Sequence, residues 1–186
     1  MNNSDNFRII NGYAMRNGIT LGIFGILTLA CFMWSLSMPF FSILFNVMVI
    51  ASPVLGGILT FRFRKAEAGT DEPFSFMSGF LHAIFMGFYA SMWVALCVFV
   101  YLQYFDHGMI FAAYAQMLDT PEMEQYLQLS GMNAQIEEMT GGTGVEGLVE
   151  AMRSAGAAPY ATFSIYLSLI LGPFISAIIG LSARRR

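Results

Sequence analysis

An uncharged segment from Gly79 to Gln103 constrains the fold of this chain more than any other feature. The segment contains no Asp, Glu, Lys or Arg. As a helix it would rise about 37 Å, which exceeds the roughly 30 Å hydrocarbon core of a bilayer. We therefore predict a transmembrane helix here, with the rest of the chain arranged around it.

The composition agrees with lipid as the solvent for much of the chain. Apolar residues make up 56% and charged residues 11%, whereas soluble domains average about 45–50% and about 25%. Cys31 and Cys97 both lie in apolar runs, so no disulfide is expected. The 186 residues leave room for a single transmembrane domain over 1–186 whose direct partner is the lipid bilayer, and we expect no nucleic-acid partner.

Four apolar runs are long enough to cross a bilayer, at about 18–38, 40–61, 77–103 and 160–182. The first two nearly touch, which predicts a tight helical hairpin. The first run is too long for the apolar core of a signal peptide, so we interpret it as a retained span. The predicted fold is all-α, an integral membrane four-helix bundle.

The basic residues predict the orientation of these spans. Of nine Lys and Arg residues, only Arg153 lies in the long loop over about 104–159. The other eight flank the opposite ends of the spans: Arg8, Arg16, Arg62, Arg64, Lys65, Arg184, Arg185 and Arg186. The positive-inside rule then places both termini in the cytoplasm and the long loop, which holds eight acids, outside a bacterial inner membrane.

The extracytoplasmic loop contains signals for short amphipathic helices. We expect span three to continue as helix until near Asp119, followed by a short helix over 121–131. A capping box formed by Thr143 and Glu146 predicts another helix that closes near residue 156. Its acidic polar face disfavours adsorption to anionic lipid, so packing on the protein is preferred.

Small residues recur at every fourth position of span three: Gly79, Ala83, Gly87, Ser91 and Ala95. Such spacing allows another helix to approach closely, which is how helices associate in lipid. The pattern predicts that span three is central and that it crosses a neighbour with a right-handed geometry.

Three polar side chains within the spans form a candidate intramembrane site: His82, Tyr89 and Asn46. An ionisable histidine inside a bilayer is a functional hypothesis by default. The alternative is a structural histidine bonded to a hydroxyl or a carbonyl, and no span supplies a carboxylate for a proton relay. For Asn46 we expect a hydrogen bond across helices.

Spans two and four contain similar interruptions, which make a candidate kink or cavity: Pro53, Gly56, Gly57, Gly172 and Pro173. Paired interruptions can mark the substrate site of a transporter. They can equally reflect kinked packing, an old duplication or chance. The basic residues that follow each interruption form a candidate inner-leaflet cluster for anionic headgroups: Arg62, Arg64, Lys65, Arg184, Arg185 and Arg186.

The sequence contains no recognisable catalytic set, metal-ligand spacing or cofactor motif, so we predict no catalytic, metal or cofactor residues. Three functions remain open. The first is a non-enzymatic partner-binding or scaffold component of a membrane complex, through another membrane protein or through self-association. The second is an oligomeric carrier or channel for a small neutral or lipidic substrate. The third is an enzyme at the outer face, which requires loop acids to line one pocket.

Several short motifs together carry a family resemblance: Arg16-Asn17-Gly18, Arg62-Phe63-Arg64-Lys65, Phe74-Ser75-Phe76 with Phe80, and the terminal Arg185-Arg186. With the four spans and the acidic loop, the whole chain resembles a family of small bacterial cytoplasmic-membrane proteins catalogued as a domain of unknown function. The resemblance implies a four-helix membrane architecture. It brings no assigned activity, and therefore no functional residue.

Overall fold

A computed structural model describes residues 3–67 and 73–185 of the chain. The chain divides into two compact units. We call Met1–Cys97 with Ala161–Arg186 the membrane unit, and Val98–Tyr160 the loop unit. Both are helical, and the one bridge between extended residues in the described ranges joins Phe74 to Arg185.

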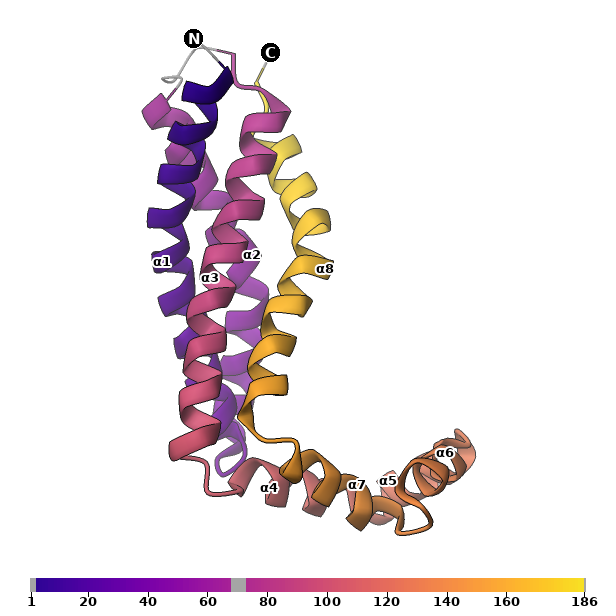
Figure 1. Ribbon diagram of the computed structural model, residues 1–186. Helices are drawn as coiled ribbons and strands as arrows, with labels where there is room; N and C mark the ends of the chain where they lie inside the picture. Colours follow the sequence, from indigo (N-terminus) through magenta and orange to yellow (C-terminus); the bar gives the residue numbers. More distant parts are fainter. Residues whose placement is uncertain (1–2, 68–72, 186) are drawn as a thin grey trace. The chain divides into compact units, whose positions relative to one another are not determined.

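The membrane unit is built from four long helices that run side by side (Figure 1). They are α1 (Asn3–Ser35), α2 (Pro39–Glu67), α3 (Phe76–Tyr104) and α8 (Ala157–Ala183). Each is long and apolar enough to cross a bilayer. This confirms the prediction of an all-α, multi-pass membrane architecture with four apolar helices.

The first helix begins earlier than its hydropathy indicates. We expected the span to start near residue 18, but α1 is helical from Asn3 onward. Its polar first half still packs, because Ile10 and Ala14 are buried against the other helices. The connection to α2 is short, as expected of a tight hairpin: α1 ends at Ser35, and the carbonyl of Trp34 accepts the N–H groups of Ser37 and Met38. Pro39 opens α2, where its missing N–H costs nothing.

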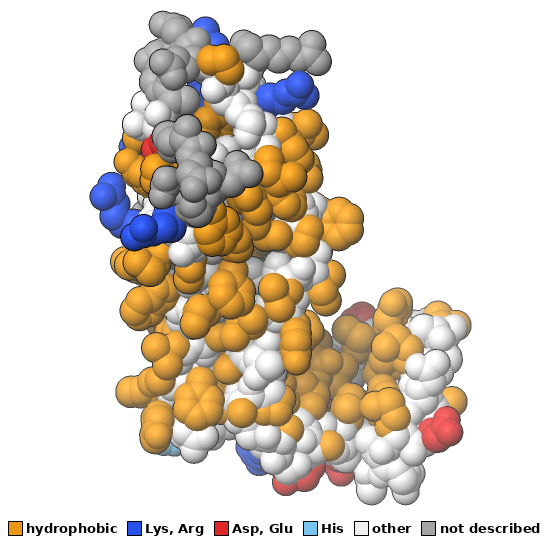
Figure 2. All heavy atoms as spheres, turned by 45° about the horizontal axis from the view of Figure 1, so that its top comes forward, with side chains coloured by type: hydrophobic (Ala, Val, Ile, Leu, Met, Phe, Trp, Pro, Cys, Tyr) orange, Lys and Arg blue, Asp and Glu red, His pale blue; other side chains and the backbone are white. Residues whose placement is uncertain are grey.

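Helix α3 packs parallel to α1 and antiparallel to α8. Gly22 of α1 lies against Trp93, and Gly79 of α3 lies against Gly180 of α8. A cluster of buried residues from α1, α2, α8 and the segment just before α3 closes one end of the unit: Ile10, Phe63, Phe74 and Ala183. The first and last described residues of the chain therefore lie at the same end. Figure 2 shows apolar side chains over one face of the membrane unit, with Lys and Arg gathered toward one end.

The loop unit contains four short helices around its own core: α4 (Met109–Leu118), α5 (Pro121–Leu129), α6 (Met132–Thr140) and α7 (Gly144–Ser154). Leu118, Leu127 and Ile136 form the buried centre. The predicted short helix after Thr120 is present, but it ends at Leu129. Helix α6 was not predicted from the sequence.

Two details of the loop prediction are wrong. Helix α3 ends at Tyr104 and does not continue to Asp119, because the carboxylate of Asp106 accepts the N–H groups of Gly108 and Ile110 and so starts a new helix. The capping box is also not formed. The Thr143 hydroxyl donates to the carbonyl of Thr140 and makes no cap bond at α7.

Candidate functional site

The membrane unit contains a pocket of about 280 Å³ between its four helices, which we call the midspan pocket. Its walls combine small and aliphatic side chains with several serines. The lining residues are Leu21, Gly25, Ser52, Pro53, Gly56, Ala83, Met86, Gly87, Ala90, Ser91, Val94, Ser164, Leu167, Ser168, Leu171, Gly172, Ile175, Ser176 and Ile179. No charged residue is among them, so the pocket suits a neutral molecule.

The pocket is elongated along the helices. On α8 its lining extends from Ser164 to Ile179, and on α3 from Ala83 to Val94. At the α-helical rise these stretches are about 22 Å and about 16 Å long. Both stretches belong to helices that are long and apolar enough to cross a bilayer.

The serines of the pocket differ in how their hydroxyls are used. Ser91 donates to the carbonyl of Phe88, and Ser168 donates across to the carbonyl of Gly87. Ser176 is 2% exposed and lines the pocket, yet its hydroxyl makes no hydrogen bond to any residue within 3–67 and 73–185. This buried hydroxyl is available to a molecule in the pocket.

His82 lies beside the pocket in a polar cluster of its own. Its ring is fully buried and stacks on Phe63 with ring centroids 4.4 Å apart. The amide N–H of Asn17 lies 3.1 Å from Nε2, and the hydroxyl of Thr60 lies 3.0 Å from Nδ1. The histidine thus connects α1, α2 and α3 through side-chain hydrogen bonds.

The partners of His82 assign its tautomer. The Thr60 hydroxyl donates to the carbonyl of Gly56 at 3.0 Å, so its oxygen accepts from Nδ1–H of the ring. The amide of Asn17 then donates to the lone pair on Nε2. Both ring nitrogens are satisfied in a neutral histidine, which is the structural alternative considered for this residue.

The other two residues of the predicted polar site do not join His82. The Tyr89 hydroxyl donates to Oδ1 of Asn11, which makes a second bond between α3 and α1. Asn46 is exposed on α2, and its amide donates to the carbonyl of Ser42 in the same helix. The expected bond from Asn46 across helices is therefore a wrong prediction.

The small residues of α3 take two different positions. A Cβ on Gly79 would lie 3.2 Å from the Cα of Gly180, which marks a close backbone approach to α8. Ala83, Gly87 and Ser91 instead line the midspan pocket, and Ala95 is buried. Their role in packing stays a prediction.

The interruptions of α2 and α8 meet at the same pocket. Pro53, Gly56 and Gly172 are in its lining, whereas Gly57 and Pro173 are not. Both helices continue across their prolines. The duplication that we considered stays a hypothesis.

The basic cluster is only partly available to lipid headgroups. Nη1 of Arg64 donates to the carbonyl of Ala183 and so caps the carboxyl end of α8. Arg62, Lys65 and Arg184 are exposed, Arg185 pairs through its backbone with Phe74, and Arg186 lies outside the described residues. Headgroup binding by this cluster stays a prediction.

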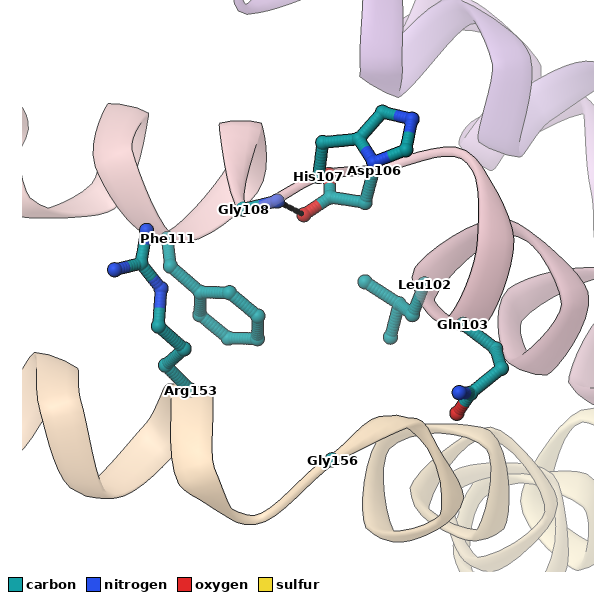
Figure 3. Close-up of a pocket in the computed structure, with 8 residues that line it drawn as sticks. All are labelled: Leu102, Gln103, Asp106, His107, Gly108, Phe111, Arg153 and Gly156. Atoms are coloured by element: carbon teal, nitrogen blue, oxygen red, sulfur yellow. Dashed lines mark hydrogen bonds between the residues drawn. The ribbon is translucent and has the colours of Figure 1, made fainter.

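The loop unit has a polar pocket of about 290 Å³, drawn in Figure 3. Leu102 and Gln103 come from the end of α3, and Arg153 from α7 faces Phe111 of α4. The carboxylate of Asp106 is only 1% exposed and caps α4. A Cβ on Gly108 would lie 2.7 Å from Nη2 of Arg153, so the guanidinium packs on this turn. Asp106 and Arg153 therefore both lie at the turn that opens α4.

A second pocket of the loop unit, of about 230 Å³, is lined by three of the loop acids: Asp119, Glu124 and Glu137. This meets the geometric condition set for an enzyme at the outer face. No histidine, cysteine, lysine or arginine lines it, and no group of three potential ligands within the described ranges is arranged to hold a metal ion. The three carboxylates are the only ionisable side chains in this lining, and an enzyme at the outer face stays a hypothesis.

Sequence reasoning missed the residues that oppose span three. Gly18 and Gly22 of α1 face Tyr89 and Trp93, and four-residue spacing within α1 was the available signal. Ser164 and Ser168 repeat the same spacing on α8. Neither pattern reveals its partner helix, because one sequence carries no information on which helices pair.

Comparison with known proteins gives one family. A family described as "Protein of unknown function (DUF4199)" matches residues 16–185. No curated protein and no solved structure matches the chain.

Proposed function

Since this chain belongs to the DUF4199 family, whose description assigns no activity, we propose from its own geometry that it is a multi-pass membrane protein that takes a neutral, chain-like molecule from the hydrocarbon layer into the midspan pocket. The proposal keeps one part of the carrier hypothesis from the sequence, the binding of a neutral or lipidic molecule, and makes no statement about its transport. The inner membrane and the cytoplasmic termini remain predictions.

One observation carries the proposal: an elongated, uncharged cavity lies between four apolar helices at mid-span. Its volume of about 280 Å³ is at the lower end of small-molecule sites, which run from about 300 to 1,000 Å³. Pro53, Leu167 and Leu171 line the pocket and are also exposed on the surface of the unit. These residues give the pocket an opening between α2 and α8 toward lipid.

Filling the pocket tests the proposal. Gly172 lines the cavity and has no atom within 4 Å of an added Cβ, so Gly172→Leu places a side chain in the cavity. Gly57 is equally open but lies outside the lining, so Gly57→Leu is the matched control. A photoreactive dodecyl diazirine should label α2, α3 and α8 in the wild type and in Gly57→Leu. Labelling should fall at least tenfold in Gly172→Leu.

Equal labelling of both variants would overturn the proposal, because occupancy would then not depend on the cavity. Peptide mapping by mass spectrometry separates pocket labelling from labelling of the lipid-facing surface. Thermal unfolding in detergent checks that both variants are folded.

A partner-binding or scaffold role is the second candidate, supported by the surface of the loop unit. Leu129 and Met139 are 81% and 75% exposed on α5 and α6. Exposed apolar side chains beside acids are typical of protein-interaction surfaces. Leu129→Ser together with Met139→Ser should abolish a specific crosslink to a partner or to a second copy in native membranes, whereas Gln128→Ser should preserve it.

A further inference from the structure

The midspan pocket also restricts the chemical class of its ligand. Resting on the proposed function, we infer that the ligand is a neutral amphiphile with a hydroxyl or carbonyl group that bonds to Ser176. Three features of the pocket point to this class: the unpaired hydroxyl of Ser176, the absence of charge in the lining, and the position of Ser176 along the pocket.

The hydroxyl of Ser176 faces the pocket and has no hydrogen-bond partner among the described residues. In helices a serine hydroxyl usually donates to a carbonyl three or four residues earlier, as Ser91 and Ser182 do here. Ser176 makes no such bond within the described ranges, although only 2% of the residue is exposed. A buried hydroxyl without a partner is unfavourable in hydrocarbon. A ligand oxygen in the pocket would satisfy it, either as donor or as acceptor.

The surroundings of the pocket exclude a charged headgroup. No Asp, Glu, Lys, Arg or His is in the lining, so an ionised group would be buried without a counter-charge. His82 lies nearby, but both of its ring nitrogens are already bonded to Asn17 and Thr60. A neutral polar group is what the serine-containing lining can stabilise.

The position of Ser176 sets the orientation of the molecule. Ser176 precedes the end of α8 at Ala183 by seven residues, which is about 10 Å of helix. It therefore lies at the end of the pocket nearer to Arg64 and the other basic residues. The apolar chain would extend from there toward Val94 and Ser164, over the length of the lining.

Competition against dodecyl diazirine labelling of the purified full-length protein tests the inference. The competitors are 1-dodecanol, dodecane, and dodecanoate at alkaline pH, which share a chain and differ in the polar group. We expect 1-dodecanol to halve pocket labelling at a concentration at least tenfold lower than the concentration of dodecane or dodecanoate that has the same effect. Ser176→Ala should remove this preference. Ser182→Ala, on the same helix but exposed and outside the lining, should retain it.

The outcomes separate the two proposals. If all competitors displace the probe equally, or if Ser176→Ala leaves the preference for 1-dodecanol unchanged, the pocket binds chains and the inferred class is wrong. Preferential displacement by dodecanoate would also overturn the class. If the probe does not label the pocket at all, the proposed function itself fails. The ratio of competitors in the wild type is decisive even if Ser176→Ala does not fold.

Discussion

Some glycines of α1 lie in close contact with α3, and others do not. An added Cβ on Gly18 would lie 2.6 Å from the Cβ of Tyr89 and 3.1 Å from the carbonyl oxygen of Met86. The second of these atoms belongs to the backbone, so relief requires α1 and α3 to move apart. Gly12, on the same helix, has no atom within 4 Å.

We expect Gly18→Ala to destabilise the protein by about 1–3 kcal/mol, the usual cost of overpacking a close contact. Gly12→Ala should be neutral, or stabilising by up to about 1 kcal/mol, because alanine favours helix at an exposed position. Thermal unfolding in detergent measures both. Equal effects would show that α1 and α3 are not in the contact described here.

The bonds of His82 lead to a second prediction at this scale. Thr60→Val removes the acceptor for Nδ1–H and should cost about 1–3 kcal/mol, because a buried donor is left unsatisfied. The matched control is Thr28→Val, since the hydroxyl of Thr28 bonds only to the carbonyl of Phe24 in its own helix. If Thr60→Val is as costly in a His82→Phe background, the cost does not arise from the histidine.

The sequence indicated some residues of the pocket region but not how they come together. The interruptions at Pro53 and Gly172 were visible, and so was His82, but their contacts depend on α1 and α8. The outcome for Asn46 illustrates the difficulty. An amide in an apolar run can bond to its own helix or to a neighbour, and only packing decides between them.

Among the elements, α8 depends on α2 for its carboxyl end. The last carbonyls of a helix have no partners within it, and the guanidinium of Arg64 supplies one at Ala183, 3.0 Å away. The same guanidinium lies over the ring of Phe61. Arg64 therefore orders two helix ends at once, whereas the neighbouring Arg62 is exposed.

Arg64→Leu should destabilise the protein by about 1–2 kcal/mol, the value of a hydrogen bond from a charged donor reduced by partial exposure. Arg62→Leu removes the same charge and should change stability by less than about 0.5 kcal/mol. Chemical unfolding in mixed micelles compares the two variants. Similar losses of stability in the two variants would mean that the positive charge contributes more than the hydrogen bond from Arg64 to the carbonyl of Ala183.

Element boundaries were predictable where hydropathy changes sharply, and not elsewhere. Span three, predicted over about 77–103, matches α3 to within one residue at each end, whereas α2 begins as predicted but continues to Glu67, past the predicted end near residue 61. Helix α1 begins at Asn3 because its polar first half has partners within the bundle, such as Tyr89 for Asn11. The end of α3 at Tyr104 follows from one side chain, Asp106, which captures two backbone N–H groups. Hydropathy detects neither interaction.

Over the whole membrane unit, the basic residues lie at the same end at which the first and last described residues of the chain and the ends of the four helices meet. The amino-terminal turns of α1, the carboxyl end of α2, the start of α3 and the end of α8 come together around Phe63 and Phe74. Arg8 and Arg16 on α1 and Arg62 and Arg64 on α2 lie toward this end. Arg16 lies over the ring of Tyr13, one turn nearer to the amino terminus, as expected of a long basic side chain that reaches out of hydrocarbon. A single insertion in which this end faces the cytoplasm satisfies the positive-inside rule.

This orientation gives the last prediction, which accessible cysteines can test in intact cells. In a background with Cys31→Ala and Cys97→Ala, Lys65→Cys reports the basic end and Gln128→Cys reports the loop unit, since both side chains are exposed. A membrane-impermeant maleimide should label Gln128→Cys in intact cells and Lys65→Cys only after permeabilisation, because the segment around residue 65 is basic and that around residue 128 is acidic. Arg8→Cys should behave like Lys65→Cys, since α1 and α2 form a hairpin whose open ends meet in one cluster. Labelling of Lys65→Cys from outside would reverse the orientation, and opposite results for positions 8 and 65 would contradict the even number of crossings between them.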